Sequence, residues 1–118
     1  MEEASSATSI AAQGLTGTVR FDGAKVSIVR QGFAGMRSGS GKGKSGIPLG
    51  AILRVDLKPA NFVVNGYIEF VLAGAEQTDT QRRGRTVDAT GNPNAVVFNQ
   101  RSNRDFAAFR DAVQAALG

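Results

Sequence analysis

Residues 15–31, which read LTGTVRFDGAKVSIVRQ, contain the pattern that decides the fold. Apolar and polar residues alternate on both sides of Asp22-Gly23, and a period of two is typical of half-buried strands. An Asp-Gly pair between alternating hydrophobics indicates a hairpin with a type I′ turn. We therefore expect two antiparallel strands, of which the second points Val26 and Ile28 inward. Its outward side chains are expected to be Lys25, Ser27 and Val29.

A second hairpin is predicted between residues 53 and 72. Its first strand alternates over residues 53–58, and the side chains expected on the inward face are Leu53, Val55 and Leu57. Its turn is expected at Asn65-Gly66, another type I′ pair, which would join residues 62–64 to residues 67–72. The pattern therefore predicts a further antiparallel pair of strands.

Four charged residues are expected on the outer face of this second hairpin. They are Arg54, Asp56, Lys58 and Glu69. Opposite charges on neighbouring strands stabilise a sheet by pairing, so we expect cross-strand ion pairs on a solvent face. Tyr67 is expected beside them as a surface aromatic residue.

The end of the chain changes from a period of two to a period of 3.6. After a last short strand at residues 95–98, an apolar stripe runs over about four turns. It consists of Phe106, Phe109, Val113 and Leu117. Ser102 and Asp105 form an acidic variant of the capping box at its start. The pattern predicts one C-terminal helix whose Phe106 and Phe109 cover the open end of the sheet.

The chain of 118 residues is expected to form one domain. Residues 1–14 are small and polar without an apolar period, so we expect a flexible tail before a single domain at residues 15–118. Residues 47–49 are short and interrupted by proline, which indicates an edge strand or a corner. Residues 73–93 are expected to be a polar loop in which any strand, near Thr86-Val87, is short.

Five to seven short strands followed by one helix predict an α+β fold. A sheet of this kind must bury one face and protect its edges. We therefore expect an antiparallel bent sheet or a partly open barrel of five to seven strands, capped by one C-terminal helix.

Composition excludes several kinds of active site. The chain contains no cysteine and no histidine, which excludes zinc sites, thiol nucleophiles and Ser-His-Asp triads. The carboxylates are interpreted as turn, cap and surface residues, and none has an apolar setting that would raise its pKa. We therefore expect a protein that is not an enzyme and that uses no metal or cofactor.

Six basic residues in two polar segments are the candidate anion-binding residues. They are Arg37, Lys42, Lys44, Arg82, Arg83 and Arg85. A net charge of +4 favours anionic partners weakly. Residues 39–45 look like a phosphate-binding loop, but Ser38 stands where the first glycine of that motif belongs, and a strand follows instead of a helix. Nucleotide hydrolysis is therefore not expected.

Several motifs that follow one another along residues 15–117 are similar to those of a known family. They are residues 17–23, residues 46–49 leading into 55–59, residues 65–71, and residues 94–98 followed by Asp105-Phe106. Their order resembles the uncharacterised pleckstrin-homology-like domains common in actinobacterial proteins. This resemblance implies that fold, and a binding or assembly module rather than a reaction. It also argues against inositol-lipid recognition at the usual loop of the fold, because that connection is only Asp22-Gly23 here.

Two functions remain open from the sequence. The first is a protein-binding or self-assembly module that uses a sheet edge or the groove beside the terminal helix. The second is an anion-binding module that contacts nucleic-acid backbone or acidic lipid headgroups through the six basic residues. Apolar runs are too short for a transmembrane segment, and the acidic N-terminal sequence does not fit a signal peptide. We therefore expect a cytoplasmic protein.

Overall fold

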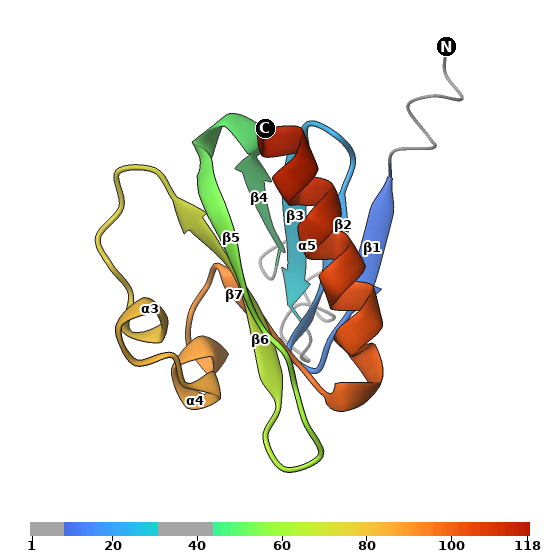
Figure 1. Ribbon diagram of the computed structural model, residues 1–118. Helices are drawn as coiled ribbons and strands as arrows, with labels where there is room; N and C mark the ends of the chain where they lie inside the picture. The colour runs from blue at the N-terminus through green and yellow to red at the C-terminus, as the bar shows by residue number, and fades with distance from the viewer. Residues whose placement is uncertain (1–8, 31–43) are drawn as a thin grey trace.

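Two antiparallel sheets form the described part of the chain, which comprises residues 9–30 and 44–118 of a computed structural model (Figure 1). The first sheet has the strand order β1 (Ile10–Gln13), β2 (Gly17–Phe21), β3 (Lys25–Arg30) and β4 (Lys44–Pro48). The second has the order β5 (Ile52–Lys58), β6 (Gly66–Leu72) and β7 (Ala95–Phe98). The α+β class and the antiparallel pairing are confirmed. The sheets of the described residues do not close into a barrel.

Two short 3-10 helices connect these parts. The helix η1 (Leu49–Ala51) leads from β4 of the first sheet to β5 of the second. Of the two alternatives predicted for residues 47–49, an edge strand is found at residues 47–48, because β4 lies at the edge of its sheet, and Leu49 begins the corner. The helix η2 (Gln100–Ser102) leads from β7 to the C-terminal helix α5 (Asn103–Leu117). The side chain of Ser102 does not cap α5, because its hydroxyl donates instead to the carbonyl of Gln13, 3.3 Å away. The capping box predicted at Ser102 and Asp105 is therefore wrong.

The helix α5 joins the two sheets by packing against β5 of one sheet and β1 of the other (Figure 1). Phe106, Phe109 and Val113 are fully buried, and the less buried Leu117 packs against the same core. The ring of Phe106 stacks on that of Phe98, with 4.2 Å between centroids. The predicted apolar stripe is therefore confirmed as the face that closes the core.

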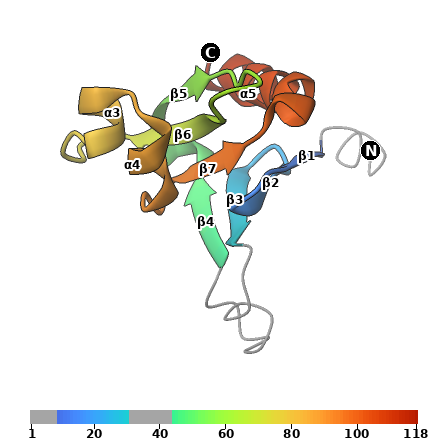
Figure 2. The ribbon, with the colours of Figure 1, turned by 90° about the horizontal axis from the view of Figure 1, so that it is seen from below.

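The opposite face of the second sheet is covered by two short helices, α3 (Asp79–Arg83) and α4 (Thr86–Thr90) (Figure 2). A small apolar cluster lies under α4 and consists of Tyr67, Ala89, Ala95 and Val97. The expectation of a loop over residues 73–93, with any strand near Thr86-Val87, is therefore wrong. The expectation that Tyr67 and Glu69 face solvent is wrong for the same reason, because both are buried under this layer.

The strand β1 lies inside residues 1–14, for which the sequence predicts a flexible tail. It pairs with β2 in the register Ile10↔Phe21, and Ala12 contributes to the core. Alanine and glutamine have weak strand preference, so no apolar period marks this segment. The boundary expected at residue 15 is therefore wrong for residues 10–13, and residues 1–8 lie outside the described residues.

The first predicted hairpin is confirmed, but its turn has different chemistry. A type I′ turn needs positive φ at both central residues. Gly23 has φ 96°, whereas positive φ occurs at no residue other than glycine in the described ranges. The carboxylate of Asp22 instead accepts hydrogen bonds of 2.9 Å from the backbone N–H groups of Ala24 and Lys25. This side-chain turn replaces the predicted type I′ geometry.

The second hairpin turns earlier than predicted. The strand β6 already begins at Gly66, and the turn lies in the preceding loop, so the expectation of a strand at residues 62–64 is wrong. Gly66 allows a close approach of backbones, since a Cβ there would lie 2.1 Å from the carbonyl oxygen of Lys58. Glycine is therefore needed here for space rather than for a left-handed turn.

Two predicted side-chain directions are also wrong. The register of β5 shifts between Ile52 and Arg54, and this bulge leaves Leu53 exposed while Ile52 enters the core. In β3, Ser27 is buried rather than outward. The inward positions of Val55 and Ile28 are confirmed.

Candidate functional site

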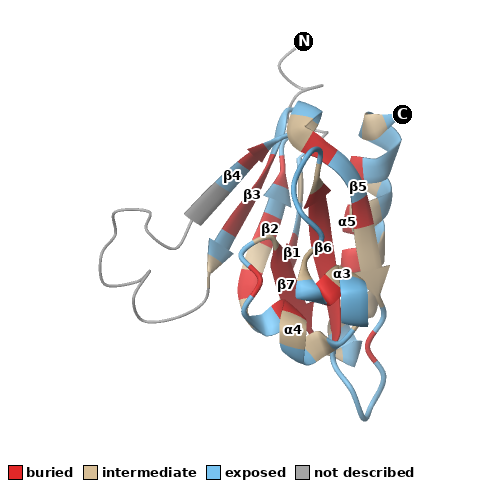
Figure 3. Cartoon of the chain, turned by 90° about the vertical axis from the view of Figure 1, so that its left-hand side faces the viewer, coloured by how far each residue is buried: buried red, intermediate tan, exposed pale blue. Residues whose placement is uncertain are grey.

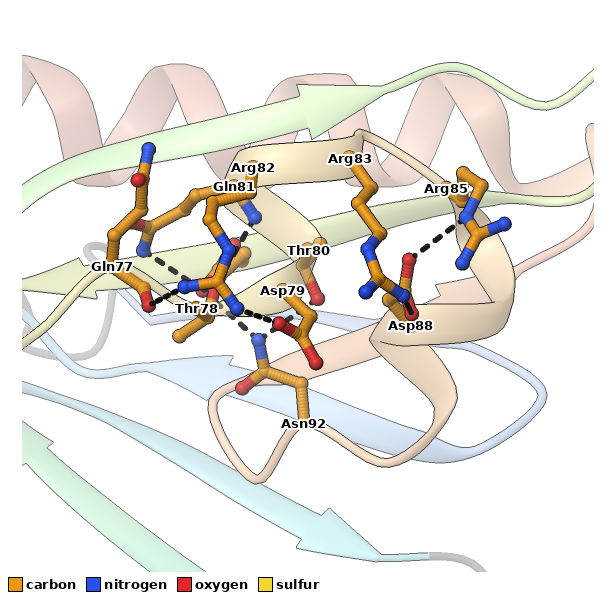
Figure 4. A network of polar contacts seen from close by, with 11 residues as sticks. Gln77, Thr78, Asp79, Thr80, Gln81, Arg82, Arg83, Arg85, Asp88 and Asn92 are labelled. Carbon is orange, nitrogen blue, oxygen red and sulfur yellow. Dashed lines mark hydrogen bonds and ion pairs between the residues drawn. The ribbon is translucent and has the colours of Figure 1, made fainter.

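Three of the six candidate anion-binding residues lie together on the α3–α4 layer (Figure 4). Arg82 pairs with Asp79, while Arg83 and Arg85 both reach Asp88, at 3.6 and 3.1 Å. All three arginine side chains are about half exposed. Each cation therefore already faces a carboxylate, which lowers the positive potential that an anion would meet.

Of the other three candidate residues, the structure describes only the backbone of Lys44, which is not on this layer. Arg37 and Lys42 lie outside the described residues. Lys44 begins β4 and pairs with Val29 in the first sheet, and its side chain is outside the description. The segment after the phosphate-loop-like sequence is a strand, as predicted, so it lacks the helix that such a loop requires.

A buried polar network under α3 was missed from the sequence. Glu69 is 1% exposed, and its Oε2 accepts hydrogen bonds from Thr78, Gln81 and Asn92 at 2.8, 3.1 and 3.0 Å. Asn92 also donates to the hydroxyl of Thr80 (Figure 4). Glu69 therefore fastens the α3–α4 layer to β6 instead of pairing with a cation.

The remaining charges of the second hairpin also differ from the predicted cross-strand pairs. Arg54 pairs with Asp56 on its own strand, at 2.9 Å. The ammonium group of Lys58 donates to the carbonyl of Gly84, 3.1 Å away, and lies over the ring of Tyr67. One sequence signal could have revealed the layer, since Thr78 and Gln81 have capping-box spacing and Thr78 does accept from the N–H of Gln81.

An apolar tip projects from the loop between β5 and β6. It consists of Phe62, Val63 and Val64, which are 87%, 75% and 43% exposed. Figure 3 shows this loop exposed along most of its length, beyond the end of the sheet. The carboxamide oxygen of Asn61 accepts from the N–H groups of Val63 and Val64, at 2.8 and 2.7 Å. The turn is therefore built by its own hydrogen bonds with its apolar side chains outward.

The base of the same loop is fixed to the start of α5. Asn103 donates to the carbonyl of Ala60 at 2.7 Å and accepts from its N–H at 2.8 Å. These two bonds satisfy both backbone groups of a buried residue. The apolar tip is therefore held in place rather than exposed by a frayed strand.

Two hollows flank this loop. The larger, of about 670 Å³, lies beside the start of α5 and is lined by Leu57, Pro59, Gln100, Arg101, Asn103, Arg104, Asp105 and Ala107. The smaller, of about 510 Å³, is lined by Asn61, Phe62, Asn65, Asn99, Gln100 and Arg101. Because Gln100 and Arg101 line both, the hollows adjoin one another next to the tip.

Comparison with known proteins places these features in a family. The family described as a domain of unknown function, DUF4429, matches residues 19–114. The chain belongs to the DUF4429 family. The matched part of this DUF4429 domain runs from β2 into the last turns of α5, so it includes the apolar tip, both hollows and the α3–α4 layer. No curated protein and no solved structure matches the chain.

Two findings concern classes of site in this DUF4429 domain. Among the residues that the structure describes, no three histidine, cysteine or acidic side chains lie close enough to hold a metal ion. None of the described helices is both long and apolar enough to cross a membrane.

Proposed function

We propose that this DUF4429 domain is a non-enzymatic binding or self-assembly module that acts through protein–protein contacts. The observation that carries the proposal is the apolar tip, because large apolar side chains that are highly exposed and held by hydrogen bonds are typical of contact surfaces. The larger hollow supports the same proposal, since it is a groove beside the terminal helix.

The proposal includes a pleckstrin-homology-like architecture of the actinobacterial type. A four-stranded antiparallel sheet, a three-stranded one and a C-terminal helix, in that chain order, agree with the fold that the sequence resemblance implies. A cytoplasmic location belongs to the same proposal, and the absence of cysteine is compatible with it.

The absence of catalysis is also part of the proposal. One carboxylate oxygen of Glu69, Oε2, accepts hydrogen bonds from the α3–α4 layer, whereas Oε1 is buried without a partner among the described residues. Tyr67 lies under the same layer. Asp79 and Asp88 face arginines on the surface. These arrangements give structural partners to Asp79, Asp88 and one oxygen of Glu69, and this supports a role without acid–base chemistry.

The alternative is an anion-binding module that uses the basic residues. Arg82, Arg83 and Arg85 are half exposed and would carry it, together with Arg37, Lys42 and Lys44. Their pairing with Asp79 and Asp88 makes this function less favoured than the first.

A salt series on heparin binding, combined with the solution mass, tests the two proposals. Binding through several cations falls steeply with salt, because counterions are released from the polyanion. We expect little heparin binding at physiological salt and no further loss when Arg82, Arg83 and Arg85 are replaced by Ser. Tight, salt-sensitive binding that the triple variant loses would favour the anion-binding function instead.

A further inference from the structure

The strand β1 forms one outer edge of the first sheet, and no described strand or helix lies beyond it (Figure 2). The N–H of Gly14 donates to the carbonyl of Gly17 at 2.8 Å, and these two residues form the next pair in the β1–β2 register. Pairs that exchange hydrogen bonds recur at every second residue of an antiparallel ladder. Ala12 therefore directs its backbone groups toward β2, whereas Ala11 and Gln13 direct theirs outward.

Most of these outward backbone groups have no partner among the described residues. The carbonyl of Gln13 is the exception, since it accepts from the hydroxyl of Ser102 at 3.3 Å. The N–H groups of Ala11 and Gln13 and the carbonyl of Ala11 are left, and both residues are exposed. A row of such groups is a template on which a further strand can pair.

The outer edges of β4 and β5 carry features that oppose such pairing. The strand β4 contains Lys44 and Pro48, and proline has no N–H to donate. The strand β5 has a bulge, and the carboxamide oxygen of Gln114 on α5 accepts from the N–H of Val55 at 3.3 Å. Both edges are therefore protected against another chain.

The outer edge of β7 is covered by the turn between β1 and β2. The carbonyl of Val97 accepts from the N–H of Leu15 at 2.7 Å, and the N–H of Val97 donates to the hydroxyl of Thr16 at 2.9 Å. Of the four edges of the two described sheets, the edge of β1 is therefore the one without a charge, a proline, a bulge or a covering segment.

We propose that β1 pairs antiparallel with β1 of a second copy of this chain, with Ala11 of each copy opposite Ala11 of the other. A two-fold axis sets a strand antiparallel to its own copy, so the outward N–H groups of each strand face the outward carbonyls of the other. The pairing joins the two four-stranded sheets into one. This contact lies on a different sheet from the apolar tip, and it goes beyond the proposed function by adding a second surface and its partner.

The charges at this edge suit a second copy of a basic chain. None of the four residues of β1 is charged, so the pairing brings no like charges together although the net charge of each copy is +4. The charged residue directly beside Ala11 in the sheet is Arg20 of β2. Three strand spacings, about 14 Å, separate Arg20 from its copy in the dimer, and salt screens charges beyond about 8 Å.

The contact is small, because β1 has four residues. A standard interface takes roughly 20 to 30 residues from each partner, so the dimer is weak and reversible. On the face of the sheet that α5 covers, the half-buried Ile10 lies opposite Ala12 of the copy and adds an apolar contact. We therefore expect a dissociation constant in roughly the high-micromolar to millimolar range.

The experiment measures association by sedimentation equilibrium and amide hydrogen exchange by NMR, up to about millimolar chain concentration. The mass of wild type should rise with concentration, and the amide protons of Ala11 and Gln13 should exchange more slowly as it rises. Ala11→Pro removes an outward N–H and should weaken the dimer about tenfold or more. The control Phe62→Ser alters the apolar tip and should leave this slowing unchanged.

A second substitution guards against a proline variant that loses its fold. Ala11→Lys keeps every backbone N–H and places two like charges opposite one another in the dimer, so it should also weaken association about tenfold. Circular dichroism should show the same fold for both variants, because the side chain and the N–H of Ala11 face outward.

Cysteine pairing adds a positional test, because the chain has no cysteine of its own. In the dimer the Cα atoms of the two copies of residue 11 lie about 5.5 Å apart, within the range that a disulfide bridges. Ala11→Cys should therefore form a disulfide-linked dimer under mild oxidation. The matched control Arg20→Cys is exposed one strand further from the edge and should form it much more slowly.

The remaining outcomes separate this inference from the proposed function. Wild type that stays monomeric at every concentration overturns the inference, and so do equal disulfide rates for the two cysteine variants. Association that Phe62→Ser removes and Ala11→Pro does not would place self-assembly at the apolar tip, which overturns the inference and supports the proposed function. The proposed function fails separately, through salt-sensitive heparin binding that the triple arginine variant loses. The expected result is concentration-dependent association that requires the free edge at Ala11.

Discussion

Asp56 and Glu69 are opposite one another in the β5–β6 ladder, yet one is at the surface and the other is 1% exposed. Directly opposite residues lie on the same face of a sheet, and two negative charges there repel. Arg54 partners Asp56, while hydrogen-bond donors from the α3–α4 layer surround one oxygen of Glu69. The same face of the sheet is therefore open to solvent at Asp56 and covered by the α3–α4 layer at Glu69.

Replacing Glu69 tests whether it fastens the α3–α4 layer. Glu69→Ala leaves the buried amide of Asn92 and the half-buried donors of Thr78 and Gln81 without this acceptor, and should lower the free energy of unfolding by about 2–3 kcal/mol. Glu69→Gln keeps an acceptor oxygen and should cost less than about 1 kcal/mol. Urea denaturation followed by circular dichroism measures both, and equal losses for the two variants would contradict this role.

The single tyrosine gives a test of the covered face by pH. Burial, and then the negative charge of Glu69, raises the pKa of Tyr67 above its ordinary value of 10.0. Because the neutral phenol is favoured in the folded state, its contribution to stability is complete below about pH 10 and is lost as the pH rises through the folded pKa. The absorbance of tyrosinate should therefore titrate above pH 10 in the native protein.

The matched measurements for Tyr67 use the unfolded chain and Glu69→Gln. In guanidinium chloride the midpoint should return to about 10. Glu69→Gln should lower the native midpoint only in part, since burial is the larger cause. A native midpoint equal to that of the unfolded chain would mean that α3 and α4 do not shield the ring.

Truncating the aromatic residues of α5 should remove much of the stability of the domain. Phe106→Ala loses a fully buried ring that stacks on Phe98, and Phe109→Ala loses the edge contact with Phe70. Each should cost about 3–5 kcal/mol in urea denaturation. Arg104→Ala, at an exposed position of the same helix, should change stability by less than about 0.5 kcal/mol. If both phenylalanine variants melted like wild type, α5 would not close the core.

The elements that could be predicted best from the sequence are those with a regular spacing of apolar residues. Asp22-Gly23 between alternating strands and the stripe that begins at Phe106 are both confirmed in place, because a period of two or 3.6 reflects burial on one face. The strand at Ile10–Gln13 has no such period and depends on pairing with β2.

The candidate site was less predictable because it depends on contacts far apart in the sequence. The helices α3 and α4 have five residues each, too few to be stable alone, and they depend on Glu69 and on the cluster around Tyr67. Phe62-Val63-Val64 has the composition of a strand, but hydrogen bonds made by Asn61 and Asn103 hold it as an exposed tip. The bulge between Ile52 and Arg54 likewise turns the side chain of Leu53 outward, although the alternating pattern predicts it inward.

The most direct test of the proposed binding surface is a map of backbone amide shifts by NMR during dilution of the isotope-labelled protein. Binding through the apolar tip and the larger hollow predicts concentration-dependent shifts at residues 57–65 and 99–107. It also predicts constant signals on α3 and α4, with or without heparin. Shifts confined to Arg82, Arg83 and Arg85 on addition of heparin, with residues 57–65 unchanged at every concentration, would contradict binding through the apolar tip.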